Sequence, residues 1–298
     1  MSGPDVLLLG ETKKRGKKTK KQLEKELMKE YNYDNECDND KYIFSQKLIY
    51  ENLHHLSSIE KTKFENKFTQ PKNGVQRDYH NLLSKKTKKI VVATGPAGTG
   101  KTLFATEIGI KNFIMGNVEK IIFTRPSVSV DEDLGYLPGT LEEKMAPWVR
   151  PIYDILYNFI NPKDVTTLLE DKIIEISPLG FMRGRTFKNC WIIADEMQNS
   201  TVSQMKMLLT RLGENTRLVV TGDLDQHDRH DEINGLDDFL NKFKGKRSSS
   251  ITSVEFDNDD IQREEIVKEV LEIYSGDIPT MYNDITDNSS INKISDSV

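Results

Sequence analysis

Short apolar runs alternate with helical patterns through the middle of this 298-residue chain. The runs are rich in β-branched residues and occupy positions 90–93, 121–123, 173–176, 190–194 and 218–220. Such runs are typical of strands that are buried on both faces of a parallel sheet. Helical patterns follow the first and the fourth run, over residues 101–115 and 202–212. The pattern predicts an α/β domain with a mostly parallel sheet.

The second helical segment carries start and end signals. Thr201 and Gln204 have the spacing of a capping box, and Gly213 stands where a C-terminal glycine is expected. One face of the segment is apolar, with Met205, Leu208, Leu209 and Leu212. We therefore expect a helix over residues 202–212.

The flanks differ from the middle in composition. The first 30 residues carry nine basic and five acidic side chains, a net +4, so the remainder of a chain of net charge −5 is −9. We expect residues 1–40 to be a basic, disordered arm, either a solvated tail or a patch for nucleic acid. Residues 41–70 have apolar positions at helical spacing and predict a helical extension. The domain then covers 71–274, and the Asn-, Asp- and Ser-rich residues 275–298 predict a disordered tail.

Hydropathy and cysteine content bear on location. No apolar run approaches the roughly 18 residues of a membrane span, and the apolar residues 6–9 are too few for a signal-peptide core. Cys37 and Cys190 are too few for a disulfide framework or a four-thiolate zinc site. We therefore expect a cytoplasmic protein. A pI near 5.7 argues weakly against nucleic acid as a partner, although the basic arm shows that the charge is unevenly distributed.

A complete G-x-x-x-x-G-K-T sequence lies between the first predicted strand and the helix that follows it. It consists of Gly95, Pro96, Ala97, Gly98, Thr99, Gly100, Lys101 and Thr102. Glycines let backbone N–H groups turn toward phosphates, and the helix N-terminus adds partial positive charge. Lys101 is expected to reach the β- and γ-phosphates, and Thr102 to bind Mg²⁺. The sequence therefore predicts a nucleotide site of the P-loop type.

Two further strand ends carry polar groups that such a site uses. Asp195 and Glu196 follow the run at 190–194, and Gln226 comes shortly after the run at 218–220. We expect Asp195 to hold Mg²⁺ and Glu196 to orient or deprotonate the attacking water. Gln226 is a candidate sensor of the γ-phosphate or of that water, with an exposed turn residue as the alternative. Strand ends at the carboxyl edge of a parallel sheet face the bound nucleotide, so these groups should lie together.

These motifs together resemble the PhoH family of cytoplasmic ATPases. The resemblance rests on the P-loop and on the stretches 124–126, 134–139, 150–154, 181–187, 195–199 and 204–213. It covers residues 71–274 and implies a single RecA-like P-loop NTPase domain, related to superfamily 1 helicase motors. It also implies ATP and Mg²⁺ as ligands and a role in RNA metabolism or in the phosphate-starvation response. Two positions depart from the family pattern, because Met197 replaces an alanine and Glu264 a histidine.

An upstream segment is similar to the family's glutamine-tyrosine motif and to helicase Q motifs. It contains Gln76 and Tyr79. A glutamine amide can pair with both N6 and N7 of adenine, so Gln76 is expected to select ATP over GTP. Tyr79 is a candidate for packing on the base, and the alternative is an ordinary helix start.

The arginines raise the question of assembly. An arginine that reaches the γ-phosphate accelerates hydrolysis by about 10³ or more. With one P-loop domain, the donor is either Arg263 in the C-terminal segment or Arg183, Arg185 or Arg211 of a neighbouring subunit, so we expect a homo-oligomer such as a ring. Arg125, Arg183 and Arg185 are also candidates for contacts with nucleic-acid phosphates. For each arginine, an ion pair with a nearby acid is the alternative.

The leading interpretation is an ATPase that acts with nucleic acid, most simply RNA. The basic arm and the three candidate arginines would then carry the binding. Two alternatives stay open. One is an ATP-gated interaction switch without helicase activity, and the other is a P-loop kinase, for which the sequence shows no arginine-rich lid.

Overall fold

A computed structural model describes most of the central part of the chain. The described residues are 65–126, 141–228, 233–262, Ile266, Val270 and Ile273. The predicted arm, the predicted tail and most of the predicted helical extension lie outside them, so these three expectations stay predictions. Arg263, the candidate arginine of the C-terminal segment, also lies outside the described residues.

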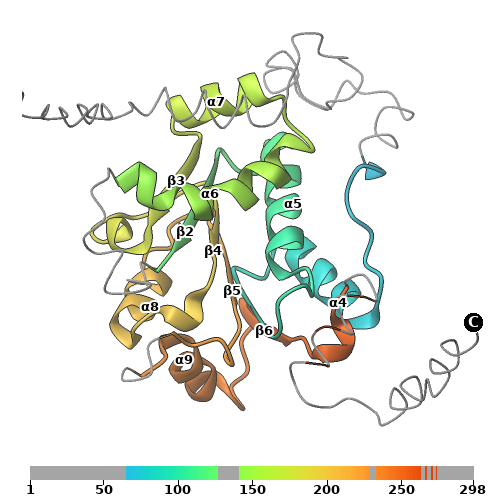
Figure 1. The fold of residues 1–298 in the computed structure, drawn as a ribbon. Coiled ribbons are helices and arrows are strands. Elements are labelled where there is room, and N and C mark those ends of the chain that lie inside the picture. Colours follow the sequence, from blue (N-terminus) through green and yellow to red (C-terminus); the bar gives the residue numbers. More distant parts are fainter. Residues whose placement is uncertain are drawn as a thin grey trace, which may run out of the picture.

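The strands of the described residues form one six-stranded sheet in which every pairing is parallel (Figure 1). They are β1 (Ile90–Thr94), β2 (Lys120–Arg125), β3 (Ile174–Pro178), β4 (Cys190–Ala194), β5 (Arg217–Gly222) and β6 (Ile251–Glu255). Their order across the sheet is β3-β2-β4-β5-β1-β6. The predicted α/β fold and its five predicted strands are confirmed. β6 was not predicted, because it is an edge strand whose positions are all partly or fully exposed, and it lacks a continuous apolar run.

Helices cover both faces of the sheet (Figure 1). One face packs against α4 (Gly74–Ser84), α5 (Lys101–Ile114), α6 (Leu141–Tyr157) and α7 (Pro162–Glu170). The other packs against η3 (Leu179–Met182), η4 (Met197–Asn199), α8 (Val202–Leu209) and α9 (Gly235–Phe243). A short turn, η5 (Asn258–Asp260), follows β6. Alternate strand residues serve the two cores, as Val91 and Val92 of β1 do, because side chains alternate across a strand.

α8 begins as predicted and ends early. The side chain of Thr201 accepts from the N–H of Gln204, and the Gln204 side chain accepts from the N–H of Thr201, which confirms the capping box. The helix stops before the end of the predicted range. Gly213 is not its C-terminal glycine, because the chain turns away to pair with residue 187 and the Gly213 N–H donates to the carbonyl of Phe187.

The strand register brings the functional loops to one edge of the sheet. Ala194 of β4 pairs with Val220 of β5, and Val220 pairs with Val92 of β1. The segments that follow these strands therefore leave the sheet side by side at its carboxyl edge. They are the P-loop after β1, Asp195 and Glu196 after β4, and the loop that begins after β5. This edge is where ligands bind in open α/β sheets.

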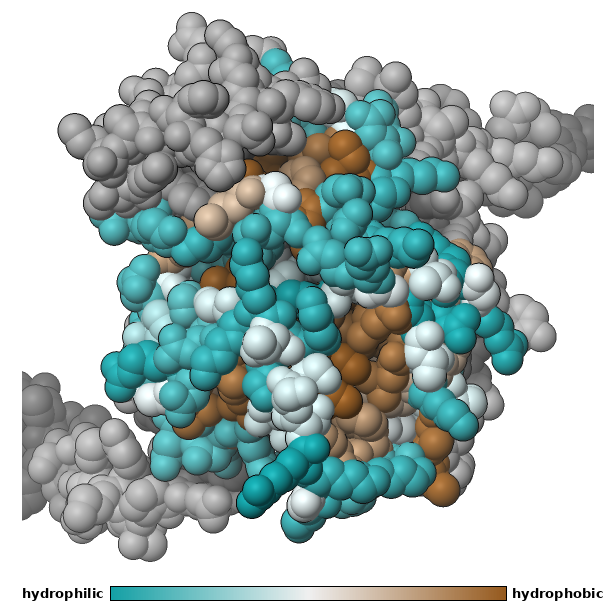
Figure 2. All heavy atoms as spheres, turned by 180° about the vertical axis from the view of Figure 1, so that it is seen from behind, coloured by the Kyte–Doolittle hydropathy of each residue, from teal (hydrophilic) through white to brown (hydrophobic). Residues whose placement is uncertain are grey.

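The surface of the molecule mixes polar and apolar areas. Seen from behind, hydrophilic side chains surround several apolar areas (Figure 2). One apolar groove of about 430 Å³ lies between α8 and α9, with Met205, Leu209 and Phe239 in its lining. Among the described residues, no helix has the length and apolarity that crossing a membrane requires.

Candidate nucleotide site

The P-loop joins β1 to α5 in a conformation that needs glycine. Gly95 has φ +129° and Gly100 has φ +90°, values that side chains with a Cβ rarely adopt. A Cβ on Gly95 would also lie 2.2 Å from the carbonyl oxygen of Phe256. The loop is therefore fixed both by its own backbone and by the segment that follows β6.

α4 supports the P-loop from behind. The Gln76 Nε2 donates to the carbonyl of Thr99 at 3.0 Å, and its Oε1 accepts from the N–H of Lys72 at 2.8 Å. The Tyr79 hydroxyl donates to the carbonyl of Lys101 at 3.1 Å. Burial raises the pKa of Tyr79 well above its ordinary value, so the phenol stays a neutral donor. Both side chains thus hold the backbone of the loop.

The position of Tyr79 corrects one expectation. Its ring is completely buried and packs edge-on against Phe256, with 5.5 Å between the ring centroids, so it is not available to pack on a base. The helix-start alternative is nearer to what is found, since α4 begins at Gly74 behind an Asn73 cap. Gln76 is buried too, and its selection of adenine stays a prediction.

Lys101 lies at the start of α5 with its ammonium inside the loop. The Nζ donates to the carbonyls of Gly95 at 2.6 Å and Pro96 at 2.7 Å. Burial lowers the pKa of Lys101, and three nearby carboxylates oppose that shift. They belong to Asp223, Asp195 and Glu196. The ammonium is therefore held between backbone oxygens and a cluster of negative charge.

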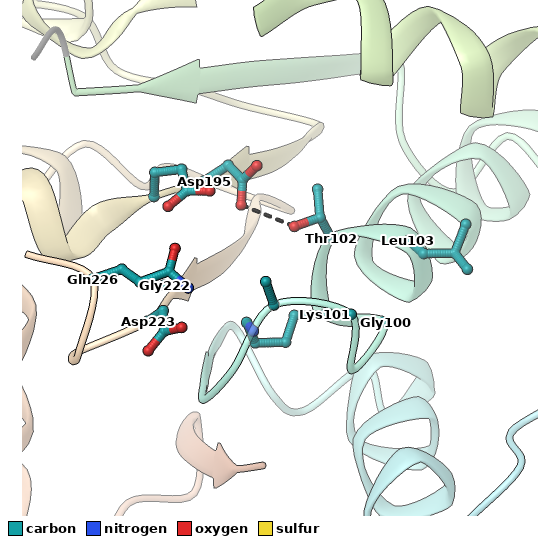
Figure 3. A pocket seen from close by; sticks show the side chains of 11 residues that line it. Gly100, Lys101, Thr102, Leu103, Asp195, Gly222, Asp223 and Gln226 are labelled. Carbon is teal, nitrogen blue, oxygen red and sulfur yellow. Dashed lines mark hydrogen bonds between the residues drawn. The ribbon is translucent and has the colours of Figure 1, made fainter. Parts of the chain in front are cut away.

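The two predicted metal ligands meet at the end of β4. The Thr102 Oγ1 donates to Asp195 Oδ1 at 2.9 Å (Figure 3). Thr221 of β5 donates its hydroxyl to the same carboxylate oxygen. Hydroxyl and carboxylate oxygens are hard ligands of the kind that Mg²⁺ prefers, so this donor set fits that ion. Sequence reasoning missed Thr221, whose signal is a polar side chain at the end of an otherwise apolar run.

Glu196 stands in an unusual backbone conformation and is held by Gln198. Its φ of +53° and ψ of +39° are left-handed, which is uncommon for a residue other than glycine and is often found at functional sites. The Gln198 Nε2 donates to Glu196 Oε2 at 2.5 Å and to the carbonyl of Gln226 at 3.3 Å. Its Oε1 accepts from the N–H of Asp223 at 3.1 Å. One buried amide therefore joins Glu196 to the loop after β5.

Asn199 anchors the far end of that loop. Its Nδ2 donates to Asp228 Oδ2 at 2.7 Å, and its Oδ1 accepts from the N–H of Asp228 at 2.9 Å. Gln226 lies between the anchors made by Gln198 and Asn199, and it is exposed toward the pocket (Figure 3). The residues that follow the acidic pair of β4 thus position the loop that carries Gln226.

These segments line one pocket of about 370 Å³ at the carboxyl edge of the sheet (Figure 3). It brings together eight of the predicted site residues, namely Ala97, Gly98, Gly100, Lys101, Thr102, Asp195, Glu196 and Gln226. Asp223, which sequence reasoning did not assign, lines it as well and is almost buried. Gln76 touches the P-loop from the other side and does not line the pocket. The pocket therefore has a cation, hard oxygen ligands and an acidic group within one small volume.

Arg185 lies in an ion pair rather than free at the surface. Its guanidinium makes two hydrogen bonds to the carboxylate of Glu175, one of them 2.8 Å long from Nη2 to Oε2. It also lies over the ring of Phe187, 4.6 Å from the centroid. Of the three interpretations of this arginine, namely a donor to a neighbouring subunit's nucleotide, a contact with nucleic acid and an ion pair, the geometry favours the ion pair.

The other arginines lie on different elements. Arg125 ends β2, and Arg183 is exposed directly after η3. Arg211 is half-buried after α8 and donates to the hydroxyl of Thr210 at 3.3 Å. None of the three lines the pocket.

The parallel sheet, the P-loop after β1 and the acidic pair after β4 define the fold of a P-loop NTPase. β5 lies between the strand of the P-loop and the strand of the acidic pair. The chain belongs to the PhoH family, because the model described as PhoH-like protein matches residues 69–275. The sequence resemblance to this family is thereby confirmed.

Curated relatives share about two fifths of their aligned residues with this chain. The PhoH-like protein of Bacillus subtilis (strain 168) is 41% identical over 200 residues, which are 67% of this chain and 61% of that protein. Protein PhoH of Escherichia coli (strain K12) is 41% identical over 199 residues, which are 66% of this chain and 56% of that protein. The match therefore spans about three fifths of the length of these relatives.

Solved helicase structures are only loosely similar. The Pif1 helicase from Candida albicans is 15% identical, with a TM-score of 0.35 over 72% of this chain and 46% of that chain. The helicase domain of Pyrococcus furiosus Hef is 11% identical, with a TM-score of 0.37 over 62% and 38%. These values are too low to support an argument about function.

Proposed function

We propose that the protein hydrolyses ATP with Mg²⁺ and couples hydrolysis to binding of nucleic acid, most simply single-stranded RNA. The observation that carries the ATPase is the 2.9 Å contact between Thr102 and Asp195, in the same pocket as Lys101 and Glu196. Metal ligands, a phosphate-binding cation and a carboxylate base are the parts that phosphoryl transfer to water requires.

Each residue has a separate task in this proposal. The P-loop N–H groups and Lys101 bind the phosphates, and Thr102 with Asp195 holds Mg²⁺. The ion supplies positive charge that neutralises the phosphate oxygens. Glu196 orients the attacking water or accepts its proton, and Gln198 keeps the Glu196 carboxylate in place.

The loop after β5 gives the site a way to report its state. Gln226 is proposed to contact the γ-phosphate or the attacking water, and its backbone carbonyl already accepts from Gln198. A shift of Gln226 on hydrolysis would therefore reach Glu196 through a single amide. Such a link suits an enzyme whose nucleotide state controls the affinity of a second ligand.

Arg263 is proposed as the arginine that stabilises the transferred phosphate. Gln262, the residue before it, donates its N–H to the carbonyl of Gly98 in the P-loop at 3.0 Å. The alternative donor is an arginine of a neighbouring subunit, in a cytoplasmic homo-oligomer such as a ring. Sedimentation of the active protein tests this alternative, and a fully active monomer would contradict it.

The test is ATP turnover of the full chain with and without a single-stranded RNA oligonucleotide. We expect Mg²⁺-dependent phosphate release that the RNA stimulates and that Lys101→Ala abolishes. Turnover that RNA leaves unchanged would favour the ATP-gated switch. Transfer of the phosphate to a metabolite instead of water would favour the kinase, and full activity of Lys101→Ala would overturn the nucleotide assignment.

A further inference from the structure

The η3 turn presents an aromatic ring to solvent. Phe181 is 58% exposed, whereas every other aromatic side chain that the structure describes is buried or half-buried. Exposing a phenyl ring leaves apolar surface in contact with water, and burying that surface in a complex would be favourable. Phe181 is therefore the one described aromatic position that is free to stack on a ligand.

The turn holds this ring in a fixed position. Leu179 and Met182 have no exposed surface and pack into the core beneath η3. Side chains three apart in a 3₁₀-helix lie on the same side, so these two face inward together and Phe181 faces away from them. The Arg183 N–H donates to the carbonyl of Gly180 at 3.4 Å and closes the turn. The exposure of Phe181 follows from its anchored neighbours.

The chain after the turn is anchored as well. Of the two arginines there, one is bound within the protein and the other is exposed. Arg185 is bound to Glu175 of β3 and stacked on Phe187, which is buried. Arg183 is exposed, and its guanidinium pairs with no carboxylate among the residues that the structure describes. Arg183 is therefore available to bind an external anion, and Arg185 is not.

A second arginine lies beside the turn. Arg125 of β2 is in register with Pro178, the residue that precedes η3, so their backbones are one strand spacing of about 4.8 Å apart. Residues 179–188 add three basic side chains and no acidic one. The exposed residues Phe181 and Arg183 form what we call the η3 surface, and Arg125 ends the strand beside it.

The η3 surface lies at the same edge of the sheet as the nucleotide site. β3, which leads into η3, is separated from β4 by one strand, and Asp195 follows β4. Two strand spacings amount to about 10 Å, so the surface is near the pocket without being part of it. A ligand on it would be within reach of the loops that the nucleotide contacts.

We propose that the η3 surface binds single-stranded nucleic acid, with Phe181 stacked on a base and Arg183 bound to a flanking phosphate. This inference rests on the proposed function and names the residues that would carry its second ligand. Unpaired bases offer flat faces to an aromatic ring, and phosphates offer charge to the guanidinium group. An acidic peptide would satisfy the arginine and leave the ring exposed, so nucleic acid matches the combination better.

The experiment measures binding of a fluorescein-labelled twelve-nucleotide oligouridylate to the full chain by anisotropy. Phe181→Ala should weaken binding about 5- to 100-fold, the range for loss of one base–aromatic stack. Phe181→Trp should retain affinity, and its added indole fluorescence should be quenched by the oligonucleotide. Log affinity falls as log salt concentration rises. Arg183→Ala should make this fall shallower by about 0.7 in slope, the value for one phosphate contact on a single strand.

Met115→Ala is the matched control, because Met115 is 48% exposed but follows the C-terminal end of α5, the helix that starts at the P-loop. Its affinity should equal that of the wild type. Equal affinities of the wild type and Phe181→Ala would overturn this inference but not the proposed function. A changed sedimentation coefficient of Phe181→Ala with unchanged affinity would also overturn it, by placing the ring in a protein interface. A wild type that binds neither the RNA nor its DNA counterpart would overturn the nucleic-acid part of the proposed function together with the inference.

Discussion

Replacing Gln198 with methionine should uncouple nucleotide binding from hydrolysis. Methionine has nearly the volume of glutamine and no strong hydrogen-bonding group, so Gln198→Met keeps the packing and removes only the polar contacts. Those contacts are the 2.5 Å bond to Glu196, the bond to the Gln226 carbonyl and the bond from the Asp223 N–H. The P-loop contacts do not involve Gln198 and should survive.

The loss in the free energy of unfolding can be estimated from these contacts. The Asp223 N–H is buried and would lose its acceptor, which costs about 1–3 kcal/mol, and the hydrogen bond to a carboxylate is worth about 1.5–3 kcal/mol. Because the half-exposed Glu196 can regain water, we expect a total loss of about 2–3 kcal/mol in the free energy of unfolding. For a domain of this size that lowers Tm by about 5–10 °C. Displacing the Glu196 carboxylate, the proposed general base, should lower turnover by about 10²-fold.

The assay compares ATP turnover, affinity for a fluorescent ATP analogue and Tm for the wild type and two variants. Gln198→Met should lose turnover while its nucleotide affinity stays within about threefold. Gln204→Ala is the matched control, since Gln204 contributes to the α8 capping box and does not line the nucleotide pocket. The free energy of unfolding of Gln204→Ala should fall by about 1 kcal/mol, and its ATP turnover should equal that of the wild type. Folded Gln198→Met protein with wild-type turnover would show that Gln198 does not position Glu196.

Two further changes test the surroundings of the site. A Cβ at Gly222 would lie 2.8 Å from Gln198 Oε1, so Gly222→Ala should push that amide away and lower turnover measured by phosphate release; unchanged turnover would contradict this. Burial raises the pKa of Glu107, whose carboxylate accepts from the N–H and the hydroxyl of Thr69. Its stabilising contribution is therefore fully present below the unfolded-state pKa and is lost as the pH rises through the folded-state pKa. Thermal melts should show that Glu107→Gln gains stability relative to the wild type as the pH rises above 4.5, the ordinary pKa of a glutamate, and a difference independent of pH would contradict this.

Local sequence was enough to predict the parts of this molecule that depend on local chemistry. Buried parallel strands need continuous apolar runs, and the P-loop needs its glycines whatever surrounds it, so both could be identified without a structure. The edge strand β6 was not predicted, because a partly exposed strand has no continuous run of apolar residues. The prediction that Gly213 ends the α8 helix was wrong, because its hydrogen-bond partner, Phe187, lies far back in the chain.

The finer organisation of the site depends on partners that are distant in sequence. Its sequence position makes Tyr79 a candidate for packing on a base or for an ordinary helix start, and in the structure its hydroxyl donates to the carbonyl of Lys101. The bonds from Gln198 to Asp223 and Gln226 join segments 25 and 28 residues apart. A sequence motif can show that a glutamine follows an acidic pair, and only the folded arrangement shows which loop that glutamine holds.

In the proposed function, Glu196 activates water for hydrolysis of an ATP molecule held by the P-loop. Single-turnover hydrolysis of pre-bound ATP by Glu196→Gln tests it most directly, with affinity for the nucleotide measured on the same sample. We expect nucleotide affinity close to that of the wild type and a hydrolysis rate lower by about 10²-fold or more. Hydrolysis by Glu196→Gln at the wild-type rate would contradict it.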